Sequence, residues 1–80
     1  MNTTNIMALN QALAGDYYKV ISIRLNETDR RRISDLGLIP NTKIKMLQKS
    51  PLGDPIAYLI RGTVIALRSE YTKKIIVQKI

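Results

Sequence analysis

The sequence predicts a small, mainly β fold in which five short strands curl into a barrel. Much of the chain consists of short runs rich in β-branched and apolar residues, separated by clusters of Gly, Pro, Asn and Asp. Only one segment has both the composition and the end signals of a full helix. A chain of 80 residues suffices for one domain, and a barrel lets short strands bury their apolar faces without leaving open edges.

The N-terminal part of the chain contributes a tail and a helical turn. We assign residues 1–8 to a polar N-terminal tail and residues 9–80 to a single domain. Leu9–Gly15 is expected to form about one helical turn that ends at the glycine. Its apolar side chains, Leu13 among them, have the spacing of one helical face and are expected to tuck against the body of the domain.

The first strand is expected at Tyr17–Leu25, which is rich in β-branched and aromatic residues. Apolar and polar residues alternate over its second half. Regular alternation places Ile21, Ile23 and Leu25 on one side of the strand. The strand is therefore predicted to be half buried.

A helix follows this strand. Residues 28–36 show helical periodicity, and either Asn26 or Thr28 is a suitable N-cap. Gly37 supplies the left-handed residue that commonly ends a helix, and Leu38 is placed to reach back to the last helical turn. These signals predict a Schellman motif at the C-terminal end.

The rest of the chain predicts four more strands. They are expected at Lys43–Lys49, Ile56–Arg61, Thr63–Arg68 and from Ile75 to about Ile80. Ser50–Pro55 is dense in turn residues and reverses the chain, and Gly62 permits a tight turn or a bulge. Ile56–Arg61 is apolar enough to be buried on both faces. A helical turn capped by Ser69 precedes the last strand, which suits the SH3-like form of a five-stranded barrel.

The chain is basic, with 13 Lys and Arg against 6 Asp and Glu and a net charge of +7. Such an excess favours acidic partners. Lys43, Lys45 and Lys49 share one face of a predicted strand, either as a basic strip or as lysines that guard an outward face against edge pairing, and we favour the second. Consecutive helical residues point apart, so one arginine of Arg30–Arg32 is expected over the core edge and the others in solvent.

The missing residue types limit the chemistry of the chain. It has no His and no Cys, which are the usual general base, thiol nucleophile and soft metal ligands. Asp29 and Asp35 lie six residues apart on the predicted helix and do not share a face. No phosphate-binding loop precedes a Lys-Ser or Lys-Thr pair. We therefore predict a protein that is not an enzyme, with no catalytic residues, no metal site and no cofactor.

The sequence favours a cytoplasmic protein. No apolar run approaches the roughly 18 residues of a membrane span. The first residues lack the basic and apolar regions of a signal peptide. The absence of Cys gives no sign of an oxidising compartment.

Four short motifs carry a resemblance to a known family. They are Leu36-Gly37-Leu38-Ile39-Pro40, Leu52-Gly53-Asp54-Pro55, Arg61-Gly62 and Ala66-Leu67-Arg68. From about Leu9 to Ile80 the chain resembles the ferrous iron transport protein A family, the small cytosolic companions of the ferrous iron permease. The same succession marks the C-terminal domain of iron-dependent repressors of the diphtheria toxin repressor kind. The chain departs from the family at Asn41, where glycine is common, but Asn tolerates the left-handed conformation.

The resemblance implies an SH3-like barrel and a role in ferrous iron uptake, by protein–protein interaction with the permease or its cytosolic GTPase domain. The family is often described as transition metal ion binding, which the donor residues of this chain do not favour. The residues expected to contact the partner are Leu52, Gly53, Asp54, Pro55, Arg31 and Arg61, and the groove for the partner is expected between the Leu52–Pro55 turn and the helix. Those expected to shape the backbone and core are Gly37, Leu38, Pro40, Gly62 and Leu67. For Leu52 two placements stay open, folded under the barrel or offered to a partner.

Two other functions stay open from the sequence. A basic small barrel that binds nucleic acid fits the charge, although four Tyr and no Phe or Trp offer few stacking platforms. A stand-alone regulatory domain of the repressor type fits the motifs, but the chain has no room for a DNA-binding helix-turn-helix. Small barrels can also exchange strands between copies, so a homo-oligomer stays open as well.

Overall fold

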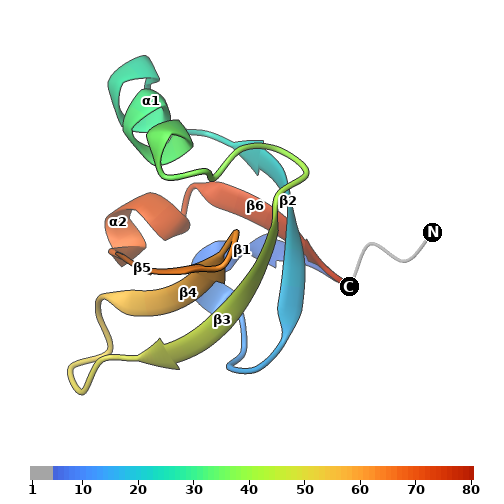
Figure 1. Cartoon of the computed structure of the whole chain (residues 1–80), viewed down its shortest axis with the longest axis vertical. Helices are drawn as coiled ribbons and strands as arrows, with labels where there is room; N and C mark the ends of the chain where they lie inside the picture. Colours follow the sequence, from blue (N-terminus) through green and yellow to red (C-terminus); the bar gives the residue numbers. More distant parts are fainter. Residues whose placement is uncertain (1–4) are drawn as a thin grey trace.

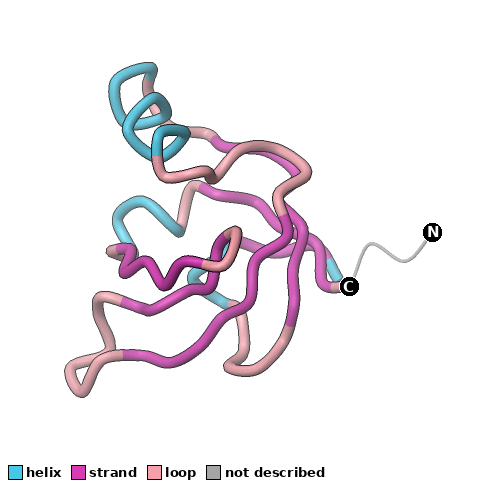
Figure 2. Tube along the Cα trace, in the orientation of Figure 1, coloured by secondary structure: helices cyan, strands magenta, loops and turns pink. Residues whose placement is uncertain are grey.

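The computed structural model describes residues 5–80, which form one 6-stranded sheet and short helices (Figures 1 and 2). In chain order the elements are β1 (Ile6–Ala8), the 3₁₀ helix η2 (Leu9–Gln11), β2 (Tyr17–Ile23), α1 (Glu27–Asp35), β3 (Lys43–Lys49), β4 (Ile56–Ile60), β5 (Thr63–Leu67), α2 (Ser69–Thr72) and β6 (Ile75–Lys79). None of the helices in this part of the chain is long and apolar enough to cross a membrane.

The sheet is antiparallel, with the strand order β1-β6-β2-β3-β4-β5. It curls around the core, but within residues 5–80 its two edge strands, β1 and β5, do not pair with each other (Figure 1). The prediction of a closed, five-stranded barrel is therefore wrong in strand number and in closure. The mainly β class, the helix after the first long strand and the N-terminal helical turn are confirmed.

The strand that sequence reasoning missed is β1. Its residues pair with Gln78, Val77 and Ile76 of β6. They belong to the segment 1–8 that the sequence assigns to a tail, of which residues 1–4 lie outside the described part of the chain. Three residues are too few to show strand periodicity, and β1 depends on pairing with a strand from the other end of the chain.

The core fills the inside of the curled sheet. Strand positions that alternate inward are the most deeply buried, and they are Tyr18, Val20, Ile44, Met46, Tyr58, Ile60, Ile75 and Val77. Leu9 and Leu38, from outside the strands, are also fully buried. Burying one such side chain contributes about 1.5–3 kcal/mol. If a strand slipped by one residue against its neighbour, these side chains would point to the outer face of the sheet. Their burial therefore fixes the register of strand pairing.

A β-bulge in β2 breaks the predicted alternation. Between Val20 and Ser22, β2 has one residue more than the facing stretch of β6, so Ile21 lies outside the ladder. Ile21 is 40% exposed, whereas Ile23 is buried. The prediction that these two isoleucines share one face is therefore wrong.

A second bulge interrupts β3 after Met46. Beyond it, Lys49 lies opposite Ile56, which is buried. Residues directly opposite in antiparallel strands point to the same face. Lys49 therefore does not continue the face of Lys43 and Lys45, and the prediction of three lysines on one strand face is wrong.

Helix α1 begins and ends at predicted signals. The Asn26 side chain accepts a hydrogen bond of 2.8 Å from a backbone N–H in the first turn, so Asn26, and not Thr28, is the N-cap. At the other end Gly37 has a φ of +94°, and the Leu38 N–H donates to the carbonyl of Ile33 at 3.2 Å. This geometry confirms the Schellman motif.

Three smaller expectations are wrong. The Leu13 N–H donates to the hydroxyl of Tyr18 at 2.9 Å, and the leucine side chain is 65% exposed, so it does not tuck against the body. In β4 only alternate residues are buried, so this strand has one buried face and one half-buried face. Helix α2 has Arg68 at its N-cap position, one residue before the predicted Ser69.

Candidate partner-binding site

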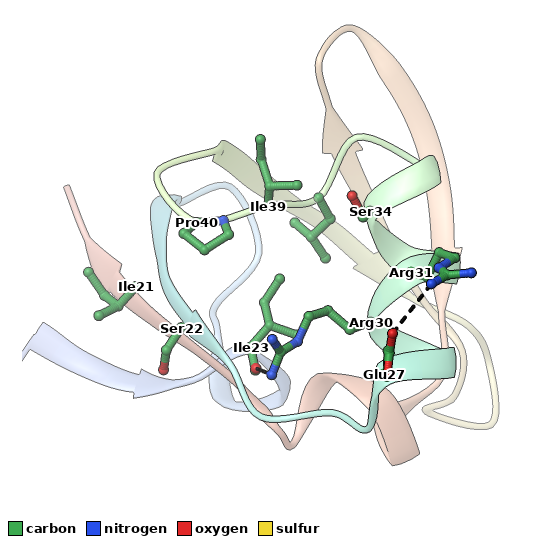
Figure 3. A pocket seen from close by; sticks show the side chains of 10 residues that line it. Ile21, Ser22, Ile23, Glu27, Arg30, Arg31, Ser34, Ile39 and Pro40 are labelled. Carbon is green, nitrogen blue, oxygen red and sulfur yellow. Dashed lines mark hydrogen bonds and ion pairs between the residues drawn. The ribbon is translucent and has the colours of Figure 1, made fainter.

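A groove of about 520 Å³ lies between α1, the end of β2 and the loop after α1 (Figure 3). It forms because α1 stands away from the sheet and buries only Ile33 (Figure 1). Its lining is mainly apolar, with Ile21, Leu38, Ile39 and Pro40 among the lining residues. We call this hollow the helix groove.

A turn fixes the loop wall of the helix groove. The Thr42 N–H donates to the carbonyl of Ile39 at 3.1 Å, and Asn41 between them has a φ of +74°. A proline before a left-handed residue is typical of a type II turn. The buried Thr42 hydroxyl accepts from the Ile39 N–H at 3.1 Å and donates to the carbonyl of Gly37 at 3.3 Å. Sequence reasoning missed this threonine, which joins the helix end to the turn.

Two exposed isoleucines give the groove its apolar character. Ile21 emerges from the bulge in β2 and is 40% exposed, and Ile39 on the loop is 39% exposed. One exposed apolar side chain is ordinary on a protein surface. Two that line the same hollow are the kind of contact that a partner can cover.

Charged residues of α1 border the groove. The Arg30 guanidinium donates to the carbonyls of Ile23 at 3.3 Å and, at 3.5 Å, of Leu25, which ties the helix to the end of β2 (Figure 3). Arg31 pairs with Glu27 at 3.4 Å, and both side chains are exposed. An exposed pair of this kind contributes at most about 1 kcal/mol. Little free energy is therefore lost when Arg31, a predicted contact residue, leaves Glu27 and pairs with an acidic side chain of a partner.

The other predicted contact residues lie elsewhere. The loop between β3 and β4 is at the far end of the molecule from α1 (Figure 1). The expected groove between this loop and the helix is therefore not formed. At the tip of the loop, Leu52 is 94% exposed, so it is offered to solvent and not folded under the sheet. Gly53 beside it has a φ of +87° and open space around it.

Asp54 and Pro55 form the base of this loop. An Asp54 carboxylate oxygen accepts a hydrogen bond of 2.8 Å from the backbone N–H of Ser69. That N–H belongs to the first turn of α2, where backbone donors lack helical partners. Asp54 thus holds α2 against the loop. Sequence spacing carried no signal of this contact, because it joins two distant segments.

Replacing Asp54 with alanine is expected to lower the free energy of unfolding by about 1 kcal/mol, because the Ser69 N–H loses its acceptor. Urea unfolding measures the loss. Asp54→Asn keeps an oxygen acceptor and is expected to retain most of the stability. An alanine variant of unchanged stability that still lost partner binding would instead make Asp54 a contact residue.

Arg61 lies in the hairpin turn between β4 and β5. Arg61 and Gly62 both have positive φ, +51° and +79°, as the two central residues of a type I′ turn require. The Arg61 side chain crosses the helix end so closely that a Cβ built on Gly37 would lie 3.2 Å from its Cδ. Gly37 is therefore needed for its backbone angle and for this contact. Of the predicted structural residues, Leu38 and Leu67 are buried.

The donor residues do not fit a transition-metal site within one copy of the chain. Residues 5–80 contain no group of three or more His, Cys, Asp or Glu side chains placed to hold a metal ion. Their carboxylates are spread over several elements, and the whole chain has neither His nor Cys. Such metals favour imidazole and thiolate ligands.

Comparisons place the chain among known proteins. Residues 7–79 match the FeoA domain family. The structure of the FeoA protein from Chlorobium tepidum is 36% identical, with a TM-score of 0.87 over 92% of this chain and 70% of that chain. The FeoA-like protein from Clostridium acetobutylicum is 35% identical, with a TM-score of 0.86 over 100% of this chain and 91% of that chain. A search of curated proteins gives no match.

A third structure bears on the fold. Stenotrophomonas maltophilia FeoA, complexed with zinc, is 26% identical and has a TM-score of 0.77 over 90% of this chain and 89% of that chain. It is described as a prokaryotic SH3 domain protein and a candidate bacterial ferrous iron transport activating factor. The curled antiparallel sheet with a helix after β2 thus places the present chain with the small SH3-like β proteins.

The chain belongs to the FeoA domain family. The match covers nearly all of the described residues, and identity above 30% extends over most of two solved FeoA structures. The family resemblance inferred from the four motifs is confirmed.

Proposed function

We propose that this chain is a non-catalytic, cytoplasmic accessory protein of ferrous iron uptake. It acts by binding the ferrous iron permease, at or beside its GTPase domain, and by modulating transport. Membership of the FeoA family supports the link to iron transport, as does the description of the Stenotrophomonas neighbour as a candidate activating factor.

The observation that carries a binding role is the helix groove. Protein interfaces commonly have an apolar centre and a polar rim. Here Ile21 and Ile39 supply exposed apolar surface, and Arg31 with Glu27 supplies a charged border. Because the turn at Ile39–Thr42 and the contacts of Arg30 fix both walls, a partner meets a preformed surface. Preformed surfaces bind with a smaller loss of conformational entropy.

The experiment places a carboxylate in the groove. Ile21→Asp is expected to weaken binding to the detergent-solubilised permease at least tenfold, because the partner must then desolvate an unpaired charge. Growth on limiting ferrous iron is expected to fall in a strain that carries only this variant. Ile21 lies outside the β-ladder, so the variant is expected to stay folded, which circular dichroism and thermal unfolding check.

Leu13→Asp is the matched control, because it adds the same charge at an apolar residue that is 65% exposed and lies outside the groove. It is expected to leave binding and growth unchanged. Equal effects of the two substitutions, or none from either, would contradict the assignment of the groove.

Leu52→Asp tests the opposite end of the molecule in the same assay. Its full exposure predicts unchanged stability, whereas Gly53→Arg would add backbone strain at a φ of +87°. If Leu52→Asp weakens permease binding and Ile21→Asp does not, the partner docks on the loop between β3 and β4.

A further inference from the structure

A second surface, away from the helix groove, gathers positive charge on the outer side of β2, β3 and β4. It consists of Lys19, Lys43 and Lys45, which share the outer face of β2 and β3 with Tyr17, and of Arg61 from the turn after β4, and we call it the basic face. A hollow of about 400 Å³ lies within it, lined by Tyr17, Lys43, Lys45 and Arg61 together with Leu59.

Strand register builds the basic face. Lys19 lies opposite Lys43, and Tyr17 lies opposite Lys45, which in turn lies opposite Leu59 on β4. The residues that alternate with them, such as Tyr18 and Ile44, point into the core. The bulge of β3 begins only after Met46, so it leaves this part of the ladder regular.

Tyr17 draws two of the cations together. The Nζ atoms of Lys43 and Lys45 lie 5.5 Å and 5.3 Å from the centroid of its ring. These are cation–π distances, at which the face of the ring attracts an ammonium group. Both ammonium groups therefore sit over one ring and border one hollow.

The positive charge of the basic face is not neutralised from within. Across residues 5–80, none of its four cations has a carboxylate oxygen within 4.0 Å. The acid just before Tyr17, Asp16, instead pairs with Lys79 at 3.5 Å. Lys19 and Lys43 are like charges directly opposite on neighbouring strands, an arrangement that destabilises a sheet. An anion bound here would relieve that repulsion.

We propose that the basic face binds an extended acidic segment of a protein partner, with carboxylates at alternate positions. Lys43 and Lys45 are two residues apart on one strand, which separates their Cα atoms by about 6.6 Å. Acids two residues apart in an extended segment have the same spacing. Leu59 and the neighbouring Val64 on β5, which is 63% exposed, add apolar surface for the segment's intervening side chains.

Nucleic acid fits the same surface less well. Binding of single strands depends on aromatic rings that are free to stack with bases. The only aromatic ring of the basic face is Tyr17, and two lysine ammonium groups already lie over it. This proposal deepens the proposed function and rests on it, since it names the chemistry by which a protein partner is recognised.

The test measures peptide binding with no permease or iron present, so its result is separate from that of the growth assay. The probe is a fluorescent 12-residue peptide of alternating Glu and Thr, and the comparison peptide has Gln in place of Glu. We expect the Glu peptide to bind more tightly and to weaken as salt rises from 50 to 300 mM, because salt screens exposed charges. No preference for the Glu peptide would overturn the proposal.

The key variant replaces Lys43 and Lys45 with Gln, and the matched control replaces Lys73 and Lys74, which are exposed and lie outside the basic face. Each lost ion pair weakens binding a few-fold, so the first double variant is expected to lose about tenfold in affinity and the control less than twofold. An equal loss in both would show attraction by net charge alone and overturn the proposal.

Two further measurements complete the test. Unfolding of the Lys43 and Lys45 double variant is expected to change little, since the loss of two cation–π contacts with Tyr17 is offset in part by relief of the repulsion between Lys19 and Lys43. Circular dichroism and thermal unfolding check that loss of binding is not loss of fold. A 12-nucleotide single strand and inorganic phosphate are titrated in parallel. Tighter binding of the oligonucleotide than of the Glu peptide, or full displacement of the peptide by equimolar phosphate, would reject an acidic peptide as the ligand.

Discussion

Replacing Leu38 with alanine is expected to lower the free energy of unfolding by about 2–5 kcal/mol, the range for removing most of a buried leucine. Leu38 is fully buried, and its N–H completes the Schellman motif by donating to the carbonyl of Ile33. The lost side chain leaves a cavity where the end of α1 meets the core. For a small domain this loss is a large part of the total stability.

Leu36→Ala is the control for that experiment. Leu36 lies two residues away on the other side of Gly37 and is 44% exposed. Its truncation is expected to cost less than about 1 kcal/mol. Urea unfolding of both variants, followed by far-ultraviolet circular dichroism, compares the two losses. Equal losses would show that Leu38 is not a core residue.

The second large effect is the loss of stability in alkaline solution. Burial raises the pKa of Tyr58 from 10.0 to about 12, because the phenolate is poorly solvated in the core. Below pH 10 the hydroxyl is neutral in both the folded and the unfolded states. Between pH 10 and 12 the unfolded chain ionises more readily, so stability is lost as the pH rises. A shift of this size corresponds to about 3 kcal/mol.

Tyr58→Phe is expected to remove this part of the alkaline dependence. Its cost at neutral pH is expected to be less than about 1 kcal/mol, since the hydrogen bond from the hydroxyl to the carbonyl of Leu9 is long, at 3.5 Å. Guanidinium unfolding at a series of pH values from 8 to 11.5, on both proteins, measures the difference. Parallel stability curves over that range would contradict the assignment.

Local signals in the sequence predicted the turns and the helix correctly. Gly37, Pro40 followed by Asn41, and Arg61 followed by Gly62 each stand where the backbone requires a left-handed residue or a fixed φ. Such requirements depend on a few neighbouring residues, so single residue types reveal them. The class of the fold could be predicted for the same reason, since runs of β-branched residues between these turns leave little choice but a sheet.

What the sequence did not reveal depends on pairing between distant segments. The bulge at Ile21 exists only in relation to β6, and β1 is a strand only because β6 accepts it. The hydrogen bond from Ser69 to Asp54 joins two separate loops. The exposed Ile21 in the helix groove follows from the bulge, whereas regular alternation places Ile21 on the same face as Ile23. The basic face was partly visible as Lys43 and Lys45, but Lys19 and Tyr17 join it through strand register alone.

The bulge in β2 also shows which residue the sheet does not need. If position 21 were deleted, Val20 would still face Val77, and Ser22 would still face Ile76. Val20 and Ile23, the inward residues on either side of the bulge, would keep their partners on β6, and β2 would pair with β6 in an uninterrupted ladder. The register of β2 against β6 therefore does not depend on Ile21, and its side chain is the one that emerges in the helix groove.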